Sequence, residues 1–140
     1  MNRHHVKGFT LVEALVALLV LSIGLLGVAA LQLTALQNNN NALFRSQATY
    51  LAYDIADRIR ANRGSALAGG YVVGYGTAPT GSTVERNDIR AWKTMLGATL
   101  PAGDGSIAIN AATGEAVIRI RWDDSKGVDP ALVFVTRTRI

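Results

Sequence analysis

The sequence has no cysteine, and both of its histidines, His4 and His5, lie within the first five residues. Thiol catalysis and the usual cysteine-containing zinc sites are therefore excluded. The rest of the chain also lacks an imidazole for acid–base work or metal binding. No glycine-rich phosphate motif stands between a strand and a helix, where a dinucleotide site would need it. We expect neither an enzyme nor a protein that needs a cofactor.

Charge is missing from one long stretch. No Asp, Glu, Lys or Arg occurs between Glu13 and Arg45, and residues 14–31 are almost unbroken Ala, Val, Leu, Ile and Gly. About 20 helical residues cross a bilayer core of roughly 30 Å. The sequence therefore predicts one membrane-spanning helix followed by a small soluble head. The net charge of +4 is modest and does not by itself indicate a nucleic-acid partner.

The charges that flank this span predict its orientation. Arg3 and Lys7 precede it, and the first charge after it is Arg45. By the positive-inside rule, the N-terminus lies in the cytoplasm and residues from about 40 onward lie outside. A cleaved secretory signal has a different order of segments. A plain signal anchor of a single-pass protein stays open on topology alone.

Glu13 is an unusual residue at the start of a membrane-spanning helix, because its charge is costly there. A carboxylate costs on the order of 2.5–3.5 kcal/mol at the bilayer centre, and less near the interface. Cleavage after Gly8 would create a cation for it, the free amino group of Phe9. Pairing within one chain is awkward at a helix start. The same two groups on neighbouring, axially staggered subunits would neutralise each other.

The run Gly8-Phe9-Thr10-Leu11-Val12-Glu13, with its basic leader and uncharged span, resembles the type IV prepilin motif. The resemblance implies that a prepilin peptidase cuts between Gly8 and Phe9 and methylates the new terminus. It also implies that Glu13 guides assembly by pairing with a neighbour's terminus. Residues 21–27 and 52–63 further resemble the minor pilins called PilV, or type IV pilus modification proteins. Major pilins often carry a proline near position 30 and a C-terminal disulfide, and this chain has neither.

Four segments follow from these patterns. We expect a leader at residues 1–8, a transmembrane and assembly helix at 9–36, an amphipathic helix at 37–63 that Gly64 stops, and a globular head at 64–140. The amphipathic stripe consists of Phe44, Ala48, Leu51, Ile55 and Ile59. Asp54 precedes Arg58 by four residues, a favourable spacing on a helix.

Two features of the long helix each allow two interpretations. The asparagines at positions 38–41 indicate either a polar exit from the membrane or a flexible joint. Gly24 and Gly27 indicate either close packing between helices or a helix that loosens locally when it enters a filament.

The predicted fold class is α+β, type IV pilin-like, with the long helix packed on an antiparallel sheet of about three strands. A loop covers residues 64–83, and Asn87 or Asp88 caps a short helix that Gly97 ends. Trp92 is expected to anchor this helix in the core against the long one. The predicted strands are Ser106–Asn110, Ala116–Trp122 and Ala131–Arg139, and Gly114 lies in the turn between the first two.

Four arginines alternate with apolar residues on the last two strands: Arg119, Arg121, Arg137 and Arg139. They predict a basic patch on the solvent face of the sheet. It is either a charged surface that resists aggregation or an electrostatic site for DNA or an acidic partner.

Three functional hypotheses remain. The first is a minor pilin that primes or modifies a type IV pilus, with the prepilin peptidase, minor and major pilins, the inner membrane and a tip adhesin as partners. Such a filament at the cell surface serves twitching motility, adhesion or DNA uptake. The second is a minor pseudopilin of a type II secretion system. The third is a filament-borne module that binds DNA or an adhesion target.

Overall fold

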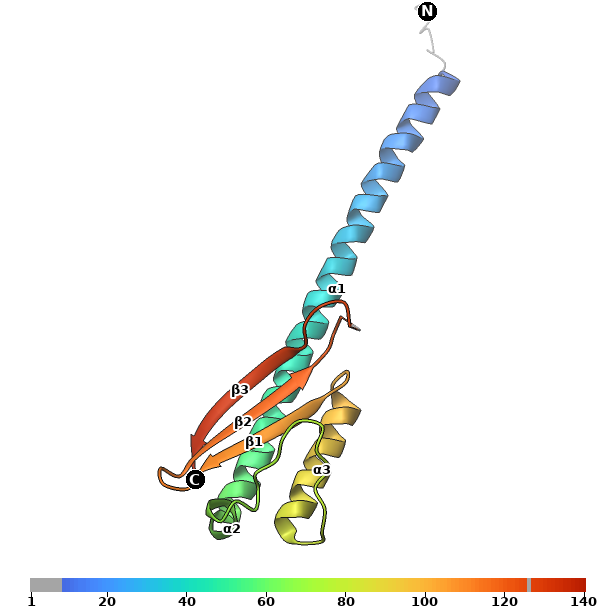
Figure 1. Cartoon of the computed structure of the whole chain (residues 1–140). Coiled ribbons are helices and arrows are strands. Elements are labelled where there is room, and N and C mark those ends of the chain that lie inside the picture. Colours follow the sequence, from blue (N-terminus) through green and yellow to red (C-terminus); the bar gives the residue numbers. More distant parts are fainter. Residues whose placement is uncertain (1–8, 126) are drawn as a thin grey trace, which may run out of the picture. The chain divides into compact units, whose positions relative to one another are not determined.

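The computed structural model describes residues 9–125 and 127–140. The chain divides into a first compact unit that ends at Asn40 and a second unit, Asn41–Ile140, and each is described by itself. The elements in chain order are α1 (Leu11–Ala61), α2 (Arg63–Leu67), α3 (Val84–Thr99), β1 (Asp104–Asn110), β2 (Glu115–Trp122) and β3 (Leu132–Arg139) (Figure 1).

The long helix α1 begins at Leu11 and stays α-helical through all four asparagines at positions 38–41. Asparagine is a poor helix former, at a cost of about 0.7 kcal/mol or less per residue relative to alanine. This cost is spread over a long helix whose backbone hydrogen bonds are already nucleated on both sides. The asparagines therefore do not interrupt the helix.

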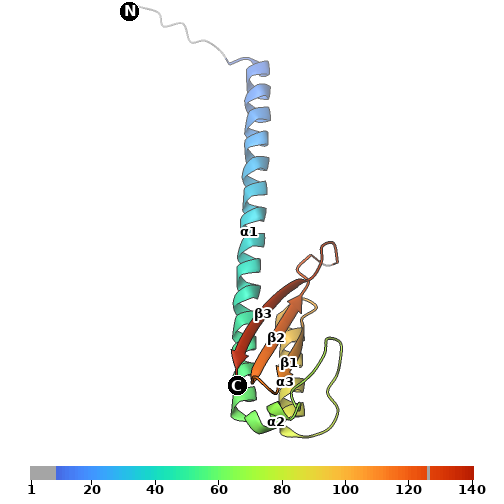
Figure 2. The ribbon, with the colours of Figure 1, turned by 60° about the vertical axis from the view of Figure 1, so that its left-hand side comes forward.

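In the second unit, three strands form an antiparallel sheet in the order β1-β2-β3 (Figure 2). The inner face of β2 presents Ile118, Ile120 and Trp122, all buried, as the alternation predicted. These side chains pack against the apolar stripe of α1. The buried residues of α1 are Ala48, Leu51, Ala52, Ile55, Ala56 and Ile59.

Helix α3 closes the core beside α1. Ile89, Trp92 and Leu96 are fully buried, which confirms the predicted apolar face. The indole Nε1–H of Trp92 donates to the carbonyl of Leu51 at 2.9 Å, so Trp92 is the anchor that the sequence predicted. The Arg58–Asp88 and Leu51–Trp92 contacts run in opposite chain directions, and the two helices are therefore antiparallel.

A glycine in β1 allows α3 to approach the sheet closely. A Cβ atom at Gly105 would lie 2.3 Å from Cη2 of Trp92 and 2.8 Å from Cδ1 of Leu96. Because such distances are far inside van der Waals contact, any side chain here must displace the indole ring. Gly105 therefore sets the spacing between β1 and α3.

Gly105→Ala is expected to lower the free energy of unfolding by about 1–3 kcal/mol, the usual cost of overpacking a filled core. Gly64→Ala is the matched control, since a Cβ there meets nothing within 4 Å. That control should change stability by less than about 1 kcal/mol. Urea unfolding of the full chain in detergent, followed by tryptophan fluorescence, measures both. Equal stabilities for the two variants would contradict this packing.

Two helix boundaries differ from those predicted. Helix α1 ends at Ala61 because Asn62 leaves the helical conformation, with φ −118° and ψ 49°, and Gly64 lies inside α2 instead of ending α1. The segment expected to be a loop thus begins with a helix. Further on, Val73 forms an isolated antiparallel bridge with Ile107, which pairs part of the outer edge of β1.

Helix α3 also begins earlier than predicted. Its N-cap is Thr83, without a side-chain capping bond, so neither Asn87 nor Asp88 caps the helix. Asp88 instead accepts hydrogen bonds from Arg58 and Tyr71. Gly97 lies within the helix, which continues to Thr99. The capping prediction was wrong because the helix begins before both residues. Asp88 is engaged by side chains distant in the sequence, and Asn87 is engaged by its near neighbours Ser82 and Arg90.

Candidate assembly and processing site

The start of α1 places the two described members of the predicted processing and assembly site. Phe9 is exposed, and Glu13 lies in the first helical turn. The hydroxyl of Thr10 accepts a hydrogen bond from the backbone N–H of Glu13 at 3.3 Å, as an N-cap does. Gly8, the third residue of the predicted site, lies outside the described residues.

The carboxylate of Glu13 is exposed. It forms no hydrogen bond or ion pair with any of the residues that the structure describes. A negative charge near a helix N-terminus is favoured by the helix dipole, by about 0.3–1 kcal/mol. This contribution offsets only part of the cost of placing a carboxylate in an apolar environment. The side chain is thus available to a cation from another molecule.

The apolar residues that follow have no protein cover. From Phe9 to Leu36, the large hydrophobic side chains are 52–83% exposed. This part of α1 is also long and apolar enough to cross a membrane. A continuous exposed apolar surface of this kind marks a membrane or protein contact. This surface therefore calls for a cover of lipid or of another protein.

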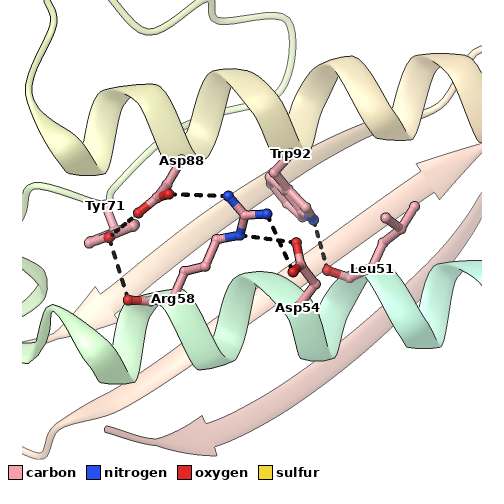
Figure 3. Close-up of polar contacts among 6 residues, drawn as sticks. All are labelled: Leu51, Asp54, Arg58, Tyr71, Asp88 and Trp92. Atoms are coloured by element: carbon pink, nitrogen blue, oxygen red, sulfur yellow. Dashed lines mark hydrogen bonds and ion pairs between the residues drawn. The ribbon is translucent and has the colours of Figure 1, made fainter.

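The C-terminal half of α1 carries a polar network that joins it to α3 (Figure 3). Arg58 pairs with Asp54 at 3.1 Å, as the spacing predicted, and with Asp88 of α3 at 3.2 Å. The hydroxyl of Tyr71 donates to the other oxygen of Asp88 at 2.6 Å. Burial would lower the pKa of Arg58, but its two carboxylate partners raise it. The network fixes the antiparallel register of the two helices.

Tyr71 makes the contribution of this network to stability depend on pH in the alkaline range. Burial, followed by the hydrogen bond to Asp88, raises the pKa of Tyr71 to about 12. An unfolded tyrosine loses its proton near pH 10. Because the folded state holds the proton more tightly, its contribution to stability is complete below pH 10 and is lost as the pH rises towards 12.

We therefore expect the stability of the wild type to fall more steeply between pH 10 and 12 than that of Tyr71→Phe. Tyr53→Phe is the matched control because Tyr53 is exposed, and its curve should follow the wild type. Urea midpoints measured at several pH values test this. Parallel curves for Tyr71→Phe and the wild type would contradict the assignment.

The four predicted basic-patch residues lie on the outward face of β2 and β3: Arg119, Arg121, Arg137 and Arg139. Two of them have acidic neighbours on the same face. Arg121 pairs with Asp104 at 3.3 Å and stacks on the ring of Tyr75, while Arg137 lies 3.9 Å from Glu115. The positive charge of this face is therefore partly compensated.

Two family models match the chain. The prokaryotic N-terminal methylation motif matches residues 3–29, and a model described as type IV pilin Tt1218 matches residues 30–87. This chain is a type IV pilin-like protein. No curated protein and no solved structure gives a significant match.

The methylation motif implies that a prepilin peptidase processes this pilin and that it assembles with other pilins. Together with the exposed apolar part of α1, the motif fits a pilin that is anchored in a membrane and later enters a filament. The family therefore suggests a structural subunit rather than a catalyst.

The pilin's helix is regular through Gly24 and Gly27, and a Cβ at either position would meet nothing within 4 Å. Alanine therefore fits both positions in the isolated chain. Whether these glycines serve helix packing or local loosening in a filament stays a hypothesis.

Sequence reasoning missed a second polar cluster around Asp104. Its carboxylate accepts from the backbone N–H of Gly76 at 2.6 Å and pairs with Lys93 at 3.0 Å. Burial would raise the pKa of Asp104, but these hydrogen bonds hold it below its usual value. The cluster ties the loop before α3 to β1. No local pattern indicates it, because its members lie far apart in the sequence.

Proposed function

We propose that this pilin is a minor subunit of a type IV pilus that primes or modifies the filament, as its resemblance to the PilV group implies. The observation that carries the proposal is the exposed carboxylate of Glu13, which has no partner among the described residues. It lies in the first turn of a helix that has no further charge before Arg45. A plain membrane anchor has no use for that charge. A subunit that must pair with the N-terminus of a neighbouring pilin does.

Assembly follows from three steps at the helix start. The peptidase cuts the Gly8–Phe9 bond and leaves an α-amino group on Phe9. The helix then leaves lipid and packs against the helices of subunits already in the filament. An axial stagger brings Glu13 of one subunit to the amino group of another, and the two charges neutralise each other in an apolar environment.

Topology and composition refine this proposal. The basic leader would stay in the cytoplasm, and the head would lie in the periplasm before extraction. The chain has no cysteine for a C-terminal disulfide and no proline before Pro79. Both absences favour a minor over a major subunit, by comparison with the pattern common in major pilins.

An in-frame deletion distinguishes this role from that of a type II pseudopilin. We propose that the deletion strongly reduces surface pili, leaves secretion of folded enzymes intact, and is complemented by the wild-type gene. Electron microscopy and assays of secreted enzymes measure the two outcomes. Normal piliation with lost secretion would assign the pilin to a pseudopilus instead.

A further inference from the structure

The sheet of the second unit has two edges, formed by β1 and β3, and they differ in cover (Figure 1). At the β1 edge, Val73 and Ile107 exchange two backbone hydrogen bonds, of 3.1 and 2.9 Å, so the loop before α3 covers the middle of that strand. At the β3 edge, no backbone group of the described residues pairs with the outer side of the strand. Arg60 of α1 contacts the side-chain hydroxyl of Thr138 and not the backbone of β3. The β3 edge is therefore the open one.

The direction of the backbone groups of β3 follows from one hydrogen bond at its end. The N–H of Ile140 donates to the carbonyl of Gly114 at 2.9 Å, and this pair continues the register of β2 and β3. In an antiparallel pair, the N–H and C=O groups of successive residues alternate between the partner strand and the opposite side. The even-numbered residues of β3 thus face β2, and the odd-numbered residues face the open edge: Val133, Val135, Arg137 and Arg139.

These outward N–H and C=O groups are almost all without a partner. Among the described residues, the carbonyl of Arg139 has one weak contact, at 3.5 Å from the hydroxyl of Thr138. The strand has no proline, and its register with β2 is unbroken, so no bulge turns the edge away from a partner. Donors and acceptors that recur at strand spacing are matched by another extended backbone. The edge therefore has the geometry to accept an additional β-strand.

The side chains on the outer face of β3 indicate the chemistry of that strand. Val133 and Val135 are 54% and 41% exposed, and Arg137 and Arg139 follow at the same spacing. β3 itself contains no acidic residue. Apolar pairs and pairs of opposite charge stabilise neighbouring strands, whereas like charges opposite each other destabilise them. The edge fits a strand with apolar residues beside the two valines and with Asp or Glu beside the two arginines.

We propose that the β3 edge binds an extended segment of another protein by β-strand addition. This segment has two acidic and two apolar residues at successive alternate positions, and it runs antiparallel to β3, the slightly more stable direction. A second copy of this chain fits less well, because its β3 supplies the same two arginines and no acidic group. The inference goes beyond the proposed function, since it concerns the head and requires neither Glu13 nor a place in a pilus.

Amide hydrogen exchange, measured by NMR on the full chain in detergent, tests the inference with a synthetic peptide. From its N-terminus, the peptide carries two glutamates and then two valines at alternate positions, with threonine between them. Binding should slow exchange at least about tenfold at the four amides that face the open edge. The amides of Thr136 and Thr138 face β2, and their exchange should change little.

Modified peptides distinguish the hydrogen-bond ladder from simple charge attraction. N-methylation of one alternate set of amides removes the donors on one side of the peptide and keeps every side chain. For the side that faces β3, it should weaken binding at least about tenfold, since main-chain hydrogen bonds supply the affinity in strand addition. Methylation of the other set is the matched control and should leave binding nearly unchanged. Lysine in place of both glutamates should weaken binding by at least about tenfold, because like charges then lie opposite each other.

Variants of the chain test the same contact from the other side. Val135→Pro removes an outward N–H without removing a hydrogen bond to β2, and proline is tolerated on edge strands. It should weaken binding of the peptide at least about tenfold, as should Arg137→Glu combined with Arg139→Glu. Arg63→Glu is the matched control, because Arg63 is exposed and lies outside the sheet, and it should bind like the wild type. Unchanged thermal unfolding shows that each variant is folded, and the N-methylated peptides need no variant at all.

Three results would overturn the inference: unchanged exchange at millimolar peptide, protection of amides outside β3 alone, or equal binding of the two N-methylated peptides. Protection of the same four amides that rises with the concentration of the pilin, without peptide, would assign the edge to a second copy and would also overturn it. Surface piliation of the deletion strain is measured independently, so each of these results leaves the proposed function standing.

Discussion

Replacing Glu13 with alanine is expected to reduce recovery of the pilin from sheared filaments at least about tenfold, while its amount in the membrane is maintained. A charge pair shielded from water contributes about 2–5 kcal/mol when one partner is removed. Each 1.4 kcal/mol corresponds to a tenfold change in an equilibrium. Since alanine removes the cost of a carboxylate in lipid, insertion itself should not suffer.

The Glu13→Gln variant distinguishes the effect of the charge from the effect of the side chain's size. Glutamine keeps the size of the side chain and its helix propensity but cannot form the ion pair, so it should behave like alanine. Thr10→Ala is a useful companion because it removes the hydroxyl that accepts from the N–H of Glu13 without touching the carboxylate. We expect it to retain most of the incorporation. Wild-type levels of Glu13→Gln in filaments would contradict the charge-pair mechanism.

Trp92→Ala is expected to lower the free energy of unfolding of the head by about 3–5 kcal/mol. The indole is fully buried between α1, α3 and β1, and its loss opens a large cavity. It also removes the hydrogen bond to the carbonyl of Leu51. Small domains are stable by only about 5–15 kcal/mol, so cells should contain much less of this variant.

Met95→Ala is the matched control, since Met95 lies on the same helix but is 41% exposed. It should cost about 1 kcal/mol or less. Urea unfolding, monitored by far-UV circular dichroism, compares the two variants. A loss of less than about 1 kcal/mol for Trp92→Ala would show that α3 does not depend on this anchor.

The helices and strands could be predicted from the sequence because buried apolar residues recur at the spacing of a helix or a strand. Steps of three and four residues marked the inner face of α1, and strict alternation marked Ile118, Ile120 and Trp122 on β2. The turn at Gly114, whose φ is +67°, was equally visible. Each of these signals is local, and each follows directly from helix or strand geometry.

Helix boundaries and polar networks were harder to predict because they depend on residues that are distant in the sequence. Asp88 looked like a helix cap, but Arg58 and Tyr71, 30 and 17 residues away, use its carboxylate. The indole N–H of Trp122 has no hydrogen-bond partner among the described residues, whereas that of Trp92 has one. This difference has no sequence signature, since the two tryptophans look alike until their surroundings are known. The N-terminal site differs because its motif is contiguous and its chemistry is carried by neighbouring residues.

We propose that cleavage of the Gly8–Phe9 bond converts Phe9 into a methylated N-terminus that pairs with Glu13 of another subunit. Intact-mass and N-terminal peptide analysis of the pilin from cells with an active prepilin peptidase tests it most directly. We expect a chain that begins with N-methylated Phe9 and has lost residues 1–8. A chain that still carries Gly8 and the leader in those cells would contradict it.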